Sequence, residues 1–172
     1  MKIAAGETIV CNKIDGVIGA VIKYNNKNCA ITAYHILEAG KCNLSDIVHL
    51  NSYKGRIIEI FWNYDLAIIE IIAPESEIKF SEIDQPKIGP AYSLNHTKRI
   101  NCRVMTVGKT FHYLAFPFNP LPLPGDSGSP IIQNEKVVGI LASIFYNNAT
   151  AIALSIERFI VHSKKINNNQ EL

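Results

Sequence analysis

The chain of 172 residues has the length of one domain or of two small packed units. Its 48% hydrophobic and 19% charged residues are typical of a globular protein and exclude wholesale disorder. A net charge of +2 is too small to indicate nucleic acid or an anionic membrane as the main partner. No apolar run approaches the roughly 18 residues that a membrane-spanning helix needs.

The first ten residues, MKIAAGETIV, are not a secretory signal, because their apolar patch is very short and Glu7 follows it. If Met1 is the natural start, we expect a cytoplasmic protein, in the host cytoplasm if it is viral. If Met1 was added to an excised fragment, this inference fails. The four cysteines include no C-x-x-C pair, so no structural zinc site is expected. Without an export signal, free buried thiols are favoured over two disulfides.

Short apolar segments rich in Ile and Val, bounded by Gly, Asn, Asp or Pro, predict β-strands along the first part of the chain. The predicted strands are 7–11, 16–24, 28–34, 47–50, 55–61 and 66–72. Tyr24-Asn25-Asn26-Lys27 predicts a hairpin turn, because Asn tolerates a positive φ. Residues 73–90 carry three prolines and no clear period, which indicates a crossing between two halves.

The second part of the chain repeats this pattern and ends in a helix. Ser155 can cap that helix, and Ile156, Phe159 and Ile160 share one face, with Lys164 and Lys165 at its end. The predicted strands are 91–94, 98–107, 110–115, 130–133, 136–145 and 150–154.

Two small all-β units bury little surface alone, so we expect them to close and to pack together. The predicted fold is therefore all-β, with two packed six-stranded antiparallel β-barrels and a C-terminal helix. The predicted parts are an N-terminal barrel (1–75), a linker (76–90), a C-terminal barrel (91–154) and a helix with a tail (155–172).

The segment PGDSGSP at 124–130 places Ser127 between two glycines. Such a loop can present a hydroxyl at its tip and free the amides of Gly125 and Ser127 to point at one spot. Converging N–H donors beside a nucleophile are what an oxyanion hole requires. The alternative is a simple β-turn, since Gly, Asp, Ser and Pro are turn residues.

Two further segments each deliver a polar side chain at the edge of a predicted strand. His35 follows the strand ending in Thr32-Ala33-Tyr34, and Asp65 begins the apolar run LAII. Taken singly, each is more often structural, His35 as a core histidine and Asp65 as a turn residue. Together with Ser127 they supply the nucleophile, the imidazole base and the orienting carboxylate that acyl transfer needs.

At this point the chain resembles chymotrypsin-fold (trypsin-like) serine proteases. TAYH, NYDLAII and GDSGSP resemble that family's T-A-A-H, N-x-D-I-A-L-L and G-D-S-G-G-P motifs, in the same chain order. The resemblance implies that Ser127 is the nucleophile, His35 the general base and Asp65 its orienter. No Cys follows His35, and Ser129 stands where the motif has Gly, as in the compact viral and bacterial branches. In secreted zymogens of this family, a freed N-terminus pairs with the Asp that precedes the nucleophile. The resemblance implies that the corresponding residue here, Asp126, needs another partner or is solvated.

The resemblance also places a substrate pocket. Leu121 lies six residues before Ser127, where enzymes specific for basic residues have Asp. Ala142-Ser143-Ile144-Phe145 corresponds to the pocket wall whose backbone pairs with substrate. Leu121 and Phe145 together favour small or medium apolar P1 residues. Alternatively, both side chains face the barrel core and carry no specificity.

His112 is a weaker candidate for the pocket, as a residue that reads Gln or Glu at P1. The alternative for His112 is an exposed histidine on a strand. Lys98, Arg99 and Arg103 alternate along one predicted strand, which usually marks a solvated face and is a weak signal for RNA.

The predicted function is therefore a serine endopeptidase that works through an acyl-enzyme on Ser127. It requires no cofactor and no metal, and its partner is a protein or peptide substrate. No membrane partner is expected, and nucleic acid is an unfavoured one. The alternative is a catalytically silent protein of the same fold that binds a partner or RNA.

Overall fold

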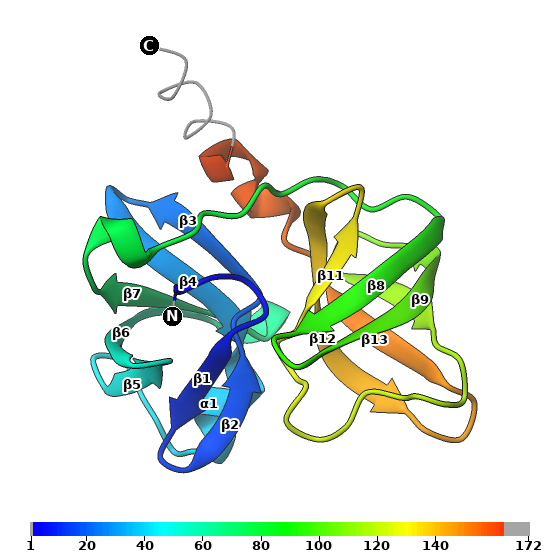
Figure 1. Ribbon diagram of the computed structural model, residues 1–172, viewed down its shortest axis with the longest axis horizontal. Helices are drawn as coiled ribbons and strands as arrows, with labels where there is room; N and C mark the ends of the chain where they lie inside the picture. The colour runs from blue at the N-terminus through cyan, green and yellow to red at the C-terminus, as the bar shows by residue number, and fades with distance from the viewer. Residues whose placement is uncertain (1, 164–172) are drawn as a thin grey trace.

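The computed structural model describes residues 2–163 and consists mainly of two antiparallel β-sheets (Figure 1). The first sheet has the strand order β2-β1-β5-β6-β7-β4-β3. Its strands are β1 (Thr8–Cys11), β2 (Ile14–Val17), β3 (Ala20–Tyr24), β4 (Lys27–Ala33), β5 (Ile47–Leu50), β6 (Tyr53–Phe61) and β7 (Leu66–Ile72). Two short helical segments interrupt it, α1 (Tyr34–Ala39) after β4 and η1 (Trp62–Tyr64) before β7.

The second sheet closes on itself in the order β10-β13-β12-β11-β8-β9 and is called the second barrel below. Its strands are β8 (Gly89–Asn95), β9 (Lys98–Val107), β10 (Phe111–Ala115), β11 (Pro130–Gln133), β12 (Lys136–Phe145) and β13 (Thr150–Leu154). Between the sheets runs the crossing segment, which contains η2 (Glu75–Glu77). In Figure 1 this crossing segment runs along the upper side of the molecule from η2 to β8.

The all-β fold predicted from the sequence is confirmed, with one difference in the first sheet. That sheet has seven strands and, in the described residues, no pairing joins its outer strands β2 and β3. The predicted strand 16–24 divides because the chain changes partners at its middle. Ile18 N–H bonds to Glu7 O at 2.8 Å, whereas Gly19 N–H bonds to Ile31 O at 2.8 Å. A side chain at Gly19 would meet Ile140 of the second barrel, so this corner lies at the junction of the two sheets.

Three apolar clusters hold the fold together, one in each sheet and one shared between them. The shared cluster joins Ile31, Leu66 and Ile68 of the first sheet to Ile140 and Leu154 of the second barrel. These side chains are at most 1% exposed. Buried apolar surface stabilises a fold by about 25 cal/mol per Å², so this shared cluster holds the two sheets together as one unit.

The chain continues from β13 into η3 (Glu157–Phe159), followed by helix as far as residue 163. Ile156 and Phe159 are buried as predicted, and Ser155 Oγ accepts a hydrogen bond from Glu157 N–H at 3.4 Å. Lys164 and Lys165 lie outside the described residues. Within residues 2–163, no helix has the length and apolar character to cross a membrane.

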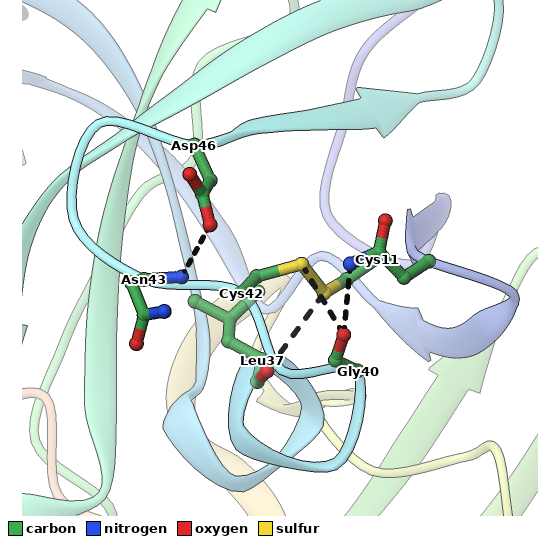
Figure 2. The surroundings of a disulfide bond; sticks show 7 residues. Cys11, Leu37, Gly40, Cys42, Asn43 and Asp46 are labelled. Carbon is green, nitrogen blue, oxygen red and sulfur yellow. Dashed lines mark hydrogen bonds between the residues drawn. A yellow bond between two sulfur atoms is a disulfide. The ribbon is translucent and has the colours of Figure 1, made fainter.

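The prediction of four free thiols is wrong for two of them. Cys11 and Cys42 form a disulfide, which ties the end of β1 to the turn after α1 (Figure 2). Gly40 packs so closely on Cys11 that a side chain there has no room. Cys29 and Cys102 are free and buried, and burial raises the pKa of both thiols to about 12.

Reduction of the disulfide should lower the free energy of unfolding by about 3–4 kcal/mol, because the bond closes a loop with a sequence separation of 31. Urea titration with and without dithiothreitol measures this change. The double variant Cys11→Ala/Cys42→Ala should show the lower stability with no response to reductant. A response that persists in this variant would mean that Cys29 or Cys102 forms the relevant bond.

Candidate functional site

His35 and Asp65 are brought together by the pairing of β4 with β7. Ala33 pairs with Leu66, so the residues just beyond these strand ends face each other. Asp65 Oδ2 lies 2.7 Å from His35 Nδ1, and Asp65 Oδ1 accepts a hydrogen bond from His35 N–H at 2.8 Å. Asp65 O accepts a third bond, from Tyr34 N–H at 2.8 Å.

These contacts fix both the orientation and the tautomer of the imidazole. An ionised carboxylate can only accept, so His35 Nδ1 carries a proton, and in the neutral imidazole Nε2 then has the free lone pair. Glu59 and Glu70, the other carboxylates nearby in sequence, have different partners. Glu59 accepts from Tyr24 Oη at 2.6 Å, and Glu70 lies 3.2 Å from Lys27 Nζ. In the described part of the chain, Asp65 is therefore the carboxylate that orients His35.

The loop around Ser127 turns at two glycines with positive φ, Gly125 (95°) and Gly128 (91°). The backbone N–H groups of Asp126 and Gly128 in this loop donate to protein carbonyl oxygens. Asp126 N–H bonds to Leu123 O at 3.0 Å, and Gly128 N–H bonds to Leu141 O at 2.8 Å. Among residues 2–163, neither Gly125 N–H nor Ser127 N–H donates to a protein atom. The two amides that the sequence singled out are thus the unpaired ones.

The Ser127 loop packs against the segment that carries His35. A side chain at Gly128 would collide with Val17 O, and it would meet Thr32 Oγ1 at 2.8 Å and Ile36 Cδ1 at 3.2 Å. Ser127 O also accepts a hydrogen bond from Val17 N–H at 3.0 Å. In residues 2–163, Ser127 Oγ makes no hydrogen bond to His35, a contact that often tightens only when substrate binds.

Asp126 has a partner that the sequence did not indicate. Its carboxylate is buried, and Oδ2 lies 2.7 Å from Lys98 Nζ. Asn95 Nδ2 donates to Oδ1 at 2.8 Å, and Leu123 N–H donates to Oδ2 at 2.7 Å. The interpretation of Lys98 as part of a solvated strand face is therefore wrong, whereas Arg99 is exposed.

The predicted pocket residues divide into two groups. Leu121 and Ile144 pack against the core of the second barrel, which is the alternative that the sequence left open for Leu121. Ser143 and Phe145 are exposed, Phe145 by 45%.

The wall strand leaves one of its edges open. β11 pairs with β12 only as far as Ile140, and Ala142 lies at a register shift between β12 and β13. Among the residues that the structure describes, Ser143, Ile144 and Phe145 therefore have a strand neighbour on the β13 side alone. Tyr146 Oη donates to Pro122 O at 3.2 Å and so joins this wall to the loop before Ser127.

His112 lies inside the second barrel, so the expectation of an exposed strand histidine is wrong. Its neighbours are Ala153, its partner in β13, and Gly139, where an added Cβ would lie 3.5 Å from His112 Cδ2. His112 Nδ1 accepts from Gly108 N–H at 3.3 Å, while Nε2 has no partner in the described residues. Burial lowers the pKa of His112 and so favours the neutral ring.

No protein-family model and no curated protein matches the chain. Solved structures do. Nocardiopsis protease (NAPase) has a TM-score of 0.73 at 12% identity, with 95% of this chain and 97% of that chain covered. Chymotrypsin from Cellulomonas bogoriensis gives 0.68 at 12% identity, covering 94% and 95%. The NSP4 proteinase of equine arteritis virus gives 0.61 at 19% identity, covering 90% and 74%. The chain has the chymotrypsin fold, as found in bacterial and viral serine proteases.

Proposed function

We propose that the chain is a serine endopeptidase with Ser127 as nucleophile, His35 as general base and Asp65 as the residue that orients His35. The observation that carries this proposal is the double hydrogen bond from His35 to Asp65, formed through both the backbone N–H and Nδ1. It leaves Nε2 as an acceptor, and the Ser127 loop packs against Thr32 and Ile36, which lie on either side of His35 in the chain. An imidazole held in this tautomer is what a serine nucleophile needs.

In the proposed reaction, His35 Nε2 takes the proton of Ser127 Oγ as that oxygen attacks the substrate carbonyl. The carbonyl oxygen becomes an oxyanion, which the unpaired amides of Gly125 and Ser127 stabilise. His35 then gives the proton to the leaving amine, and an acyl-enzyme remains on Ser127. Water, activated by His35, hydrolyses this ester and restores the enzyme.

Substrate is proposed to bind as an extended peptide along the open edge of β12. Within residues 2–163, Ser143, Ile144 and Phe145 pair only with β13, so their other edge can take a substrate strand. Solved structures of the same fold are proteases, and this supports a protein or peptide as the substrate class. The cytoplasmic location suggested by the first residues is opposed by the Cys11–Cys42 bond, because thiols stay reduced in the cytosol.

A fluorophosphonate probe tests the proposed function. It should add one label per chain, on the peptide containing Ser127, and Ser127→Ala should abolish the labelling. Ser129→Ala is the matched control, since Ser129 Oγ is buried and donates to Asp126 O. Absence of labelling in the unmodified chain would favour the silent binding protein, for which salt-dependent RNA retention is the next measurement.

Peptide-library cleavage should show Leu, Val, Ala or Gln at P1 rather than Arg or Lys. The segment from Pro86 to Gly125 holds no carboxylate, and the Asp126 carboxylate is already paired with Lys98. A buried P1 cation would therefore lose solvation without an acidic partner. Phe145→Gly should widen acceptance toward larger aromatic residues. A dominant preference for Arg or Lys would overturn this prediction.

A further inference from the structure

The turn that leads into Asp65 is held from outside the first sheet. The guanidinium carbon of Arg158, in η3 after the second barrel, lies 3.6 Å from the centroid of the Tyr64 ring. It also lies 5.0 Å from the centroid of the Phe61 ring. Phe159, next to Arg158, is buried with its ring centroid 6.0 Å from that of Phe61. The C-terminal segment therefore contacts both ends of η1.

Among residues 2–163, few other side chains support this turn. None of the three residues of η1 is buried; Trp62 is 66% exposed and Tyr64 37%. Asp65 follows in the left-handed region at φ 52°, a conformation that non-glycine residues adopt infrequently. The pairing of Phe61 with Leu66 closes the base of the turn. Beyond that base and the bonds of Asp65, the contacts of its side chains are Trp62 against Tyr34, at 4.6 Å between ring centroids, and Tyr64 under Arg158.

We propose that Arg158 is a positioning residue, which holds the 62–65 turn by stacking on Tyr64 and thereby keeps the Asp65 carboxylate on His35. The His35–Asp65 pair of the first sheet would then be fully ordered only when the C-terminal segment of the second barrel is docked. The expected effect of Arg158 on turnover rests on the proposed function. Its expected effect on the His35–Asp65 hydrogen bond does not depend on that function.

The surroundings of Arg158 make its substitution informative. A cavity of about 430 Å³ borders Arg158 and Tyr64 and is also lined by Lys109, Thr110, Ser155 and Glu157. Shortening Arg158 therefore enlarges an open space and displaces no core side chain. The chain also offers a matched control, because Arg99 stacks on Tyr92 at 3.7 Å, on the second barrel.

The kinetic test compares Arg158→Gln, Tyr64→Leu and their combination with Arg99→Gln. Arg158→Gln should lower kcat about three- to fivefold with KM unchanged, the equivalent of one exposed cation–π contact. Tyr64→Leu should lower kcat similarly, and the double variant should lose no more than either single one. Arg99→Gln should match the unmodified chain. Equal effects of the two arginine variants, or additive losses at Arg158 and Tyr64, would overturn the inference.

A spectroscopic test does not depend on catalysis. In ¹⁵N-labelled protein, the proton on His35 Nδ1 should give a downfield resonance, because it is held 2.7 Å from a carboxylate oxygen, heavy atom to heavy atom. Exchange of this proton with water should be faster in Arg158→Gln than in Arg99→Gln. If the unmodified chain is not labelled by fluorophosphonate, the proposed function fails. The rate of proton exchange at His35 Nδ1 still tests whether Arg158 positions Asp65. Equal exchange in both variants would overturn the role of Arg158.

Discussion

Replacement of Asp65 by Asn is expected to lower kcat by a factor on the order of 10⁴. The asparagine oxygen can still accept the bond that His35 N–H now gives to Asp65 Oδ1, so the turn should keep its shape. The asparagine NH₂ group would then face His35 Nδ1 and donate to it. The ring proton would move to Nε2, which could no longer accept the proton of Ser127 Oγ.

Steady-state kinetics on a peptide substrate measure this loss, with the thermal midpoint as a check of the fold. Glu59→Gln and Glu70→Gln are the controls, since their carboxylates contact Tyr24 and Lys27 instead of His35. Both should keep kcat close to that of the unmodified chain. Near-normal turnover of Asp65→Asn would show that a carboxylate other than Asp65 orients the imidazole during the reaction.

The strands could be predicted because short apolar runs and turn residues are local signals. Asn25 and Asn26 take φ values of 49° and 63° in the predicted hairpin turn. His35 and Asp65 became candidates only together with Ser127 and the three motifs, and the register of β4 on β7 brings the two residues together.

Features that depend on distant parts of the chain could not be predicted. The Cys11–Cys42 bond needs the end of β1 to lie beside the turn after α1, which no spacing rule reveals. The break between β2 and β3 arises where the partner of the chain changes from Glu7 at Ile18 to Ile31 at Gly19, beside a bond from Val17 N–H to Ser127 O in the loop before β11. Strand alternation also misplaced Lys98, because its long side chain reaches from a strand end to the buried Asp126 carboxylate.

Removal of the Lys98 charge should cause the second-largest loss of kcat, after replacement of Asp65. In Lys98→Met the Asp126 carboxylate would stay buried with only neutral donors, from Asn95 Nδ2 and Leu123 N–H. Breaking a buried ion pair costs about 3–5 kcal/mol; because the Lys98 side chain is 34% exposed, we expect about 3 kcal/mol. We expect the loop to rearrange, so that the amides of Gly125 and Ser127 lose the arrangement proposed to stabilise the oxyanion and kcat falls about 10²-fold.

Three comparisons identify the unpaired charge as the cause. Lys98→Arg keeps a cation within reach and should recover most of kcat. Arg99→Gln removes the neighbouring exposed charge and should have no effect. The double variant Lys98→Met/Asp126→Asn should exceed Lys98→Met in kcat, because an amide at this position needs no counter-charge. A double variant no better than Lys98→Met would show that the lysine acts through something other than the Asp126 charge.

The Lys98–Asp126 pair also predicts activity without a freed N-terminus. Ile3 is fully buried, and its backbone bonds to Glu77 O at 2.7 Å and to Lys79 N–H at 2.9 Å. Ile3 is thus held on the crossing segment, while Asp126 already has its cation in Lys98. A tag added before Met1 should therefore leave kcat/KM and the rate of fluorophosphonate labelling unchanged. A tagged protein that becomes active only after the tag is cleaved would mean that the N-terminus, and not Lys98, completes the Ser127 loop.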